Sequence, residues 1–345
     1  MLMSQTPTES LKVLLLGNMA VTALEGLQAR VQVPCEFIPA PGKLEDPKAL
    51  SLIEDADVLV APGFTKKMGA VAKKLRLVQA PFAGLEAFDL EALPPGVVLA
   101  NVYNHEVSIA EFVLMAMLVL SKRLKKYDAD LRRGFWDHKP FFTEPLVGEL
   151  QNKILGLIGF GHIGQEIAVR ARAFSMKIWA IRKHGREGIP DSKASQLDFL
   201  GGKEDLTQLL SQADFIVLCC PLTEETRGLI GAKEFNIMKP TAYLINIARA
   251  EIVNEEALYQ ALWEKKIAGA ALDVWYRYPR GYPSTSDEQC FPSRFPFQDL
   301  DNVIMTPHIS GRAESTLQGR LRDIAENINR VYHGQPLKNV VYVGK

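Results

Sequence analysis

Six short apolar segments recur at regular intervals through the second half of the chain, and each gap between them carries a helical pattern. A continuously apolar segment indicates a strand buried on both faces, and strands interleaved with helices indicate a parallel sheet covered by helices on both sides. The pattern therefore predicts a doubly wound α/β domain that binds its ligand at the carboxyl ends of the strands. The six segments begin at Lys153, Lys177, Phe215, Ala242, Ala268 and Val303.

A similar, less regular series occupies the first hundred residues, with strands expected over 11–17, 56–63, 75–81 and 97–102. Between the two series we expect one long helix that begins near Ser108 with a capping box formed by Ser108 and Glu111. A last helix is expected from about Arg312. Since 345 residues are many for a single core, we predict two α/β domains, both with doubly wound parallel sheets.

Composition argues against several kinds of partner. The formal net charge is zero and the basic residues are scattered, so no nucleic-acid or anionic-membrane surface is indicated. No secretory signal is visible, and the longest apolar run, residues 112–120, is too short to span a bilayer. The four cysteines have neither metal-ligand nor disulfide spacing. We expect a cytoplasmic protein with reduced, structural thiols, no metal site, and no nucleic-acid or membrane partner.

A glycine-rich turn follows the first strand of the second series. Its glycines form the pattern G-x-G-x-x-G between an apolar strand and the start of a helix. We expect Gly159 to permit a tight turn, Gly161 to let a pyrophosphate approach the backbone, and Gly164 to let the helix pack on the sheet. The helix N-terminus then offers amides to the phosphates. The residues expected to contact the dinucleotide here are Gly159, Phe160, Gly161, His162, Ile163 and Gly164.

The strand after this turn ends without the acid that commonly binds the adenosine ribose of NAD. Arg182, Lys183 and His184 follow it, and the first acid is Glu187. A guanidinium and an ammonium group suit a 2′-phosphate better than a 2′-hydroxyl. We therefore predict NADP as the cofactor, bound by Arg182 and Lys183. The alternative is NAD, with its ribose held by backbone groups beside a solvated basic turn.

Two ionisable residues stand at the carboxyl ends of later strands. Arg249 follows the strand that begins near Ala242, and His308 follows the last strand of the series. An arginine fork binds a carboxylate through two hydrogen bonds, and a histidine gives or takes a proton near neutral pH. Beside a hydride carrier, these groups suit the interconversion of a 2-oxo acid and a 2-hydroxy acid.

Over residues 11–341 the chain resembles the D-isomer-specific 2-hydroxyacid dehydrogenases, through the glycine turn and the segments 220–231, 245–258 and 302–311. The resemblance implies an NAD(P)-binding Rossmann domain, residues 108–310. It would be inserted in a flavodoxin-like substrate-binding domain made of residues 1–107 and 311–345. It also implies a homodimer that associates through the long helix after Ser108.

The resemblance also assigns roles. Arg249 would bind the substrate carboxylate and polarise the carbonyl, and His308 would transfer the proton. The backbone amides of Ala83 and Gly84 would hold the carboxylate, and His105 stands where the family often has an asparagine near the substrate. Further cofactor contacts would come from Pro221, Thr226, Ile247, Ala248, Asp273 and Ser310, with Asp273 at the nicotinamide end.

One position departs from the family pattern. The glutamate that usually pairs with the catalytic histidine falls on Tyr278, five residues after Asp273 and just before Pro279. Three explanations are open. The Tyr278 hydroxyl binds His308 directly, Asp287 or Glu288 folds back as a substitute, or dehydrogenase activity is lost. Without the acid, the imidazole should titrate nearer its reference pKa of about 6.5.

The sequence therefore predicts an NAD(P)-dependent oxidoreductase of the glyoxylate or hydroxypyruvate reductase type. Its substrate would be a small 2-oxo or D-2-hydroxy acid, with Arg249, His308 and Tyr278 as catalytic residues. Two alternatives remain. One is a dehydrogenase of another small anion such as formate or phosphite, although Ala83 stands where a phosphite enzyme would carry lysine. The other is a non-catalytic dinucleotide sensor.

Overall fold

The computed structural model describes residues 10–136, 146–279 and 289–345, which divide into two compact units. Residues 10–104 and 314–345 form the first unit. Residues 105–136, 146–279 and 289–313 form the second. The borders predicted at 107/108 and 310/311, and the substrate-binding and dinucleotide-binding roles of the two parts, stay predictions.

The first unit is built on a six-stranded sheet with the order β13-β5-β4-β3-β1-β2. Five strands are parallel, and β13 runs antiparallel to β5 at one edge. The order 2-1-3-4-5 of the parallel strands is that of flavodoxin-like folds. The strands are β1 Leu11–Leu16, β2 Cys35–Ala40, β3 Val58–Val60, β4 Leu77–Gln79, β5 Val98–Ala100 and β13 Val340–Val343.

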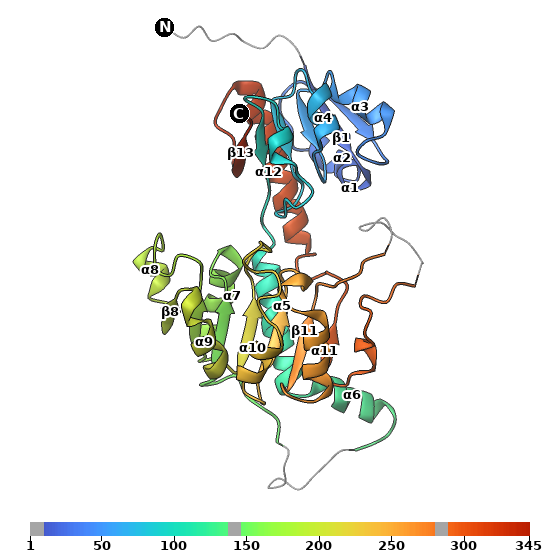
Figure 1. The fold of residues 1–345 in the computed structure, drawn as a ribbon. Coiled ribbons are helices and arrows are strands. Elements are labelled where there is room, and N and C mark those ends of the chain that lie inside the picture. Colours follow the sequence, from blue (N-terminus) through green and yellow to red (C-terminus); the bar gives the residue numbers. More distant parts are fainter. Residues whose placement is uncertain (1–9, 137–145, 280–288) are drawn as a thin grey trace. The chain divides into compact units, whose positions relative to one another are not determined.

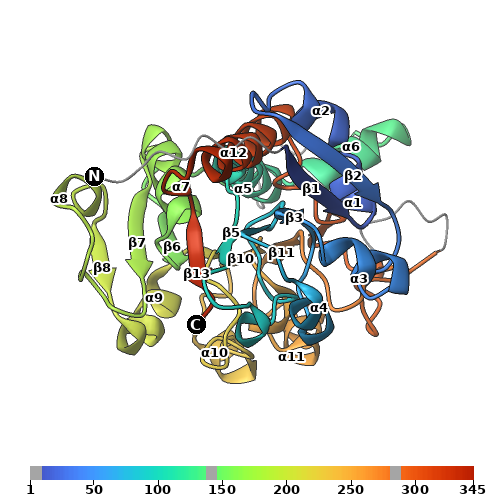
Figure 2. The ribbon, with the colours of Figure 1, turned by 90° about the horizontal axis from the view of Figure 1, so that it is seen from above.

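Helices cover both faces of this sheet (Figure 2). The C-terminal helix α12 and the short α2 pack on one face, where Leu321, Ile324 and Ile328 meet Val13 and Leu15 of β1. The helices α3 and α4 cover the other face. The helical segments are α1 Asn18–Val21, α2 Leu24–Gln28, α3 Pro47–Ile53, α4 Lys66–Val71, η1 Leu90–Ala92 and α12 Glu314–His333.

The second unit contains a seven-stranded parallel sheet with the order β12-β11-β10-β9-β6-β7-β8 (Figure 1). Counted from β6, the order is 3-2-1-4-5-6-7, which contains the dinucleotide-binding order and reverses between β6 and β9. The strands are β6 Ile154–Ile158, β7 Lys177–Ile181, β8 Phe199–Gly201, β9 Phe215–Leu218, β10 Tyr243–Asn246, β11 Gly269–Leu272 and β12 Val303–Met305. Both sheets confirm the predicted fold class.

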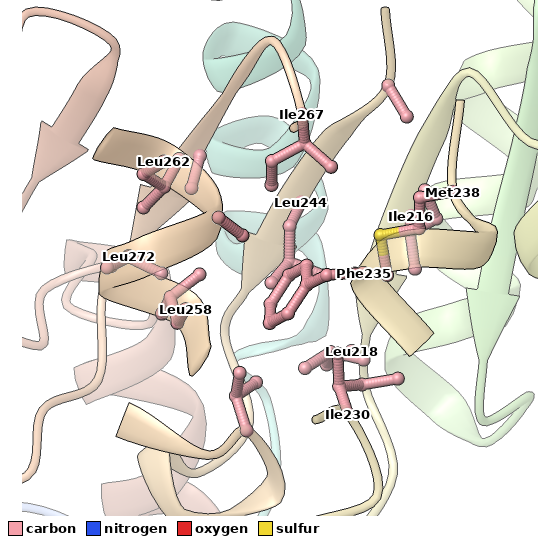
Figure 3. Packing of buried hydrophobic residues seen from close by; sticks show 14 of the residues in the cluster. Ile216, Leu218, Ile230, Phe235, Met238, Leu244, Leu258, Leu262, Ile267 and Leu272 are labelled. Atoms are coloured by element: carbon pink, nitrogen blue, oxygen red, sulfur yellow. The ribbon is translucent and has the colours of Figure 1, made fainter. Parts of the chain in front are cut away.

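Two hydrophobic clusters sandwich the second sheet. One joins the strands to α5 and α7, and the other joins them to α9, α10 and α11. In the latter, Phe235 of α10 packs near Leu244 and Leu218 of adjacent strands (Figure 3). The helical segments are α5 Glu106–Ser121, α6 Leu124–Arg132, α7 His162–Ala173, α8 Asp191–Ala194, η2 Lys203–Asp205, α9 Leu206–Gln212, α10 Ala232–Ile237, η3 Ala250–Ile252, α11 Glu255–Trp263 and η4 Phe297–Asp299.

Three strands, β2, β8 and β13, are not among the predicted ones, and each lies at the edge of its sheet. An edge strand pairs on one side only and is often short or interrupted by polar residues. β2 is interrupted by Glu36 and Pro39, whereas β8 and β13 are apolar but only three and four residues long. Hydrophobic patterning therefore detected the central strands and overlooked these three at the edges.

The helix expected from Ser108 differs from the prediction in two ways. It begins at Glu106 after a left-handed residue, Asn104 (φ 71°), so Ser108 is no N-cap and the predicted capping box is wrong. The Ser108 hydroxyl instead donates to the Ser310 carbonyl oxygen at 2.6 Å. The helix also ends at Ser121, because Arg123 is left-handed (φ 54°), and α6 then starts as a separate helix. Among the described residues, no helix combines the length and apolarity needed to cross a membrane.

Candidate active site

The glycine turn lies at the topological switch point, between β6 and α7. Gly159 has φ 105°, and a Cβ there would lie 2.7 Å from the Cys219 carbonyl oxygen. A Cβ on Gly164 would lie 2.8 Å from the Gly159 oxygen, so both positions require glycine for packing alone. A Cβ on Gly161 would meet nothing within 4 Å. The backbone at Gly161, just before the amides of α7, therefore faces open space that fits a dinucleotide phosphate.

The turn after β9 is held by its own side chains. The Thr226 hydroxyl donates to the Pro221 carbonyl oxygen at 2.7 Å and accepts from the Thr223 amide at 2.7 Å. Cys219 lies beneath the glycine turn, where its thiol donates to the Gly159 carbonyl oxygen at 3.0 Å. Burial raises the pKa of Cys219 far above its usual range. Thus Cys219 serves packing, and Pro221 and Thr226 form a fixed turn beside the predicted phosphate site.

The predicted 2′-phosphate residues at the end of β7 make contacts within the protein. The Arg182 guanidinium donates to the Glu187 carbonyl oxygen at 2.6 Å. The Lys183 ammonium pairs with the Glu225 carboxylate at 2.9 Å. Glu225 belongs to the turn after β9, far from β7 in the sequence, so the residues that directly follow β7 gave no sign of it. The tertiary structure therefore brings an acid to a strand end that lacks one in the sequence.

Arg249 stands on a turn fixed by a buried asparagine. The Asn246 side chain, 2% exposed, donates to the Arg249 carbonyl oxygen at 3.0 Å and accepts from the Ala248 amide at 3.1 Å. Ile247 and Ala248 are buried, and the half-buried Arg249 side chain donates from Nη1 to the Ala248 oxygen at 2.8 Å. The arginine thus projects from a rigid turn at the carboxyl end of β10.

His308 stands at the end of β12 in a left-handed conformation, φ 56°. Such a conformation costs a non-glycine residue roughly 1–2 kcal/mol, so its surroundings must enforce it. Asp273, fully buried at the end of β11, accepts from the Thr306 hydroxyl at 2.7 Å and from the amides of Ile309 and Ser310 at 2.8 Å each. The Asp273 carboxylate therefore closes the turn on both sides of the histidine.

The aromatic segment after Asp273 ties this turn to its neighbours. The Trp275 indole donates to the Thr306 carbonyl oxygen at 2.8 Å, and the Tyr276 hydroxyl donates to the Val253 carbonyl oxygen at 2.9 Å. Val253 directly follows the short η3 helix that Arg249 caps. The segment is thus anchored both to the His308 turn and to the arginine turn.

Tyr278 meets His308 directly. Its hydroxyl lies 3.1 Å from His308 Nδ1 and also accepts from the Trp275 amide at 3.2 Å. This is the contact that the first of the three explanations requires. Asp287 and Glu288, named in the second explanation, lie outside the described residues. Where relatives are expected to have a charged partner for this histidine, this chain places a neutral hydroxyl.

The remaining predicted residues occupy two places. In the first unit, Ala83 and Gly84 follow β4, and the Asn101 amide holds their loop by donating to the Ala83 carbonyl oxygen at 3.0 Å. In the second unit, His105 caps α5 and packs beside Gly311, where an added Cβ would lie 3.2 Å from the histidine Cβ. His162 begins α7, and its Nδ1 lies 3.9 Å from the Glu106 carboxylate. Phe160 is buried and Ile163 is half-buried.

Known proteins resemble the chain over most of its length. The family model for the NAD binding domain of D-isomer specific 2-hydroxyacid dehydrogenases matches residues 114–310. A D-3-phosphoglycerate dehydrogenase of Methanocaldococcus jannaschii is 36% identical over 297 residues, which are 85% of this chain but only 53% of that relative. A glyoxylate reductase of Thermococcus gammatolerans is 34% identical over 306 residues, 86% of each chain.

A solved structure agrees in fold. It is that of a D-isomer specific 2-hydroxyacid dehydrogenase family protein from Aeromonas salmonicida subsp. salmonicida, with a TM-score of 0.75 and 29% identity. The match covers 96% of this chain and 99% of the other. Together with the ordered motifs at the strand ends, these matches confirm the predicted resemblance. The chain therefore belongs to the family of NAD(P)-dependent D-isomer specific 2-hydroxyacid dehydrogenases.

Proposed function

We propose that this enzyme reversibly reduces a small 2-oxo acid of the glyoxylate or hydroxypyruvate class to the D-2-hydroxy acid. The observation that carries the proposal is the way in which neighbouring residues fix the backbone and the ring of His308. A left-handed turn, closed by the buried Asp273 carboxylate, fixes its backbone, and Tyr278 engages its Nδ1. Glyoxylate reductase is also the name of a relative matched over most of both chains.

The roles follow from the chemistry of each group. When bound, the nicotinamide supplies a hydride to C2 of the substrate. The Arg249 guanidinium binds the substrate carboxylate through two parallel hydrogen bonds and draws electron density from the adjacent carbonyl. His308, with Nδ1 engaged by Tyr278, donates a proton from Nε2 to the developing alkoxide, and in the reverse direction it takes that proton back. The Ala83 and Gly84 amides complete carboxylate binding.

Cofactor binding is proposed for the turns already described. The glycine turn from Gly159 to Gly164 holds the pyrophosphate at the N-terminus of α7. Asp273, fully buried and bonded to the backbone around His308, would support the nicotinamide end together with Ser310, and the turns at Pro221–Thr226 and Ile247–Ala248 would line the rest. What supports NADP over NAD is the pair of basic residues, Arg182 and Lys183, at the end of β7. Comparing kcat/KM for NADPH and NADH tests this preference, and a strong NADH preference would refute it.

The activity itself is tested by following NAD(P)H oxidation with glyoxylate, hydroxypyruvate and pyruvate, and NAD(P)+ reduction with 3-phosphoglycerate. We expect turnover with the first two and a loss of at least a hundredfold in kcat for His308→Gln, with cofactor binding retained. Turnover with formate or phosphite in the oxidative direction would favour the other small-anion dehydrogenases. Tight cofactor binding without turnover of any acid would favour a sensor.

We also propose that the enzyme is a homodimer associated through α5 and α6. None of the α6 residues is buried, and large apolar side chains stay exposed on this part of the second unit. They include Met115, Leu124, Leu131, Phe135 and Trp136, at 45%, 54%, 52%, 65% and 80% exposure. Multi-angle light scattering should report a dimer for the wild type and a monomer for Leu131→Glu. A wild-type monomer at micromolar concentration would contradict the proposal.

A further inference from the structure

An acid from a distant part of the chain pairs with one of the two predicted 2′-phosphate residues. Glu225 lies in the turn after β9, 42 residues beyond Lys183, and its carboxylate pairs with the Lys183 ammonium at 2.9 Å. The side chains are 62% and 55% exposed, so neither is locked by packing. The ion pair can therefore open without disturbing a core.

Glu225 is held at this place by its own turn. The Thr223 and Thr226 side chains close the turn through hydrogen bonds to its backbone, including the Thr226 hydroxyl to the Pro221 oxygen at 2.7 Å. The backbone that carries Glu225 is thus fixed beside the end of β7, while its carboxylate can rotate.

The surroundings of Glu225 are basic. The Lys183 ammonium, through a hydrogen bond and its charge, lowers the pKa of Glu225, and the charges of Lys203 and His184 act in the same direction. The carboxylate is therefore ionised at neutral pH. It places a negative charge among the basic residues at the predicted 2′-phosphate site. An anion placed beside a carboxylate is repelled, and it competes for the same cation.

We propose that Glu225 is a specificity-determining residue that competes with the 2′-phosphate of NADP for Lys183 and thereby moderates the preference for NADP over NAD. With NAD, the ion pair stays intact and the 2′-hydroxyl is tolerated. With NADP, Lys183 turns from Glu225 to the phosphate. This inference rests on the proposed function, in that it takes the end of β7 as the site of the adenosine ribose.

Calorimetric binding of adenosine 2′,5′-bisphosphate and of ADP to the full chain isolates this site from catalysis. Glu225→Gln should bind the 2′-phosphorylated probe about three- to tenfold more tightly than wild type, with ADP affinity unchanged. Glu224→Gln is the matched control, because it removes one exposed carboxylate from the adjacent position of the same turn. An equal effect of both variants, or weaker binding by Glu225→Gln, would overturn the inference.

A double-mutant cycle with Lys183→Gln completes the test. If Lys183 is the group for which carboxylate and phosphate compete, Glu225→Gln should lose its effect in the Lys183→Gln background. An effect that persists there would overturn the competition. If only the proposed NADP preference fails, wild type will bind adenosine 2′,5′-bisphosphate and ADP equally. A preference for the 2′-phosphorylated probe that appears only in Glu225→Gln would still support the role of Glu225.

Discussion

Removing the Tyr278 hydroxyl tests the most unusual feature of the site. The hydroxyl lies 3.1 Å from His308 Nδ1 and 3.2 Å from the Trp275 amide nitrogen, on a side chain that is 36% exposed. A hydrogen bond to a group that becomes charged contributes about 1.5–3 kcal/mol. Because water reaches this side chain, we take the lower end, about 1.5 kcal/mol. Tyr278→Phe should then lower kcat/KM for the 2-oxo acid about tenfold.

The assay is steady-state reduction with saturating cofactor, alongside a separate measurement of cofactor Kd. Cofactor Kd should change less than twofold, since the hydroxyl acts on the base. Tyr276→Phe is the matched control. It removes a half-buried hydroxyl that donates to the Val253 carbonyl oxygen at 2.9 Å, so it should lower Tm by a few degrees while reducing the rate less than Tyr278→Phe does.

Two results would refute this reasoning. An unchanged kcat/KM in Tyr278→Phe would show that the hydroxyl does not orient the base. A loss as large as that of His308→Gln would show that Tyr278 does more than orient it, since one partly exposed hydrogen bond cannot account for such an effect.

Three further predictions concern the same unit. Asp273→Asn should lower kcat about tenfold, because its amide nitrogen would face the Ser310 N–H and one backbone hydrogen bond to the His308 turn would fail. A loss seen only in cofactor Kd would contradict this. Gly161→Ala should leave Tm unchanged in thermal unfolding and weaken NADPH binding about tenfold, because its Cβ enters open space where the pyrophosphate is expected. Gly159→Ala should unfold at a clearly lower temperature, because its Cβ would lie 2.7 Å from a carbonyl oxygen at φ 105°; equal Tm values would refute the difference. Burial raises the pKa of Cys220 to about 11, so at pH 8 only about one thiol in a thousand is ionised. Iodoacetamide should then label the exposed Cys290 first, as peptide mass spectrometry would show, and equally fast labelling would contradict the burial.

Much of this enzyme follows from local sequence patterns. The central strands are apolar on both faces because helices cover both sides of each sheet, and that periodicity is readable without coordinates. The glycine turn was predictable as well, since Gly159 and Gly164 are required wherever a helix packs this tightly against a strand end. The family resemblance, now confirmed, rested on residues at strand ends, where parallel strands bring ligand-binding groups to one edge. The assignments of Arg249 and His308 stay predictions that the variants above test.

Only the tertiary structure decided how those groups are supported. Asp273 closes the turn of His308, 35 residues later, Tyr278 meets His308 across 30 residues, and Glu225 meets Lys183 across 42. Such contacts depend on strand order and on the course of the loops, which hydrophobic periodicity does not encode. Three edge strands escape the sequence pattern because β2 is interrupted by Glu36 and Pro39 and β8 and β13 are only three and four residues long. By itself the sequence determined the sheets, the glycine turn and the residues at the strand ends. The tertiary structure decided which residues hold His308 in place and which acid pairs with Lys183, because hydrogen bonds and charges act between atoms that are close in space, however far apart in the chain.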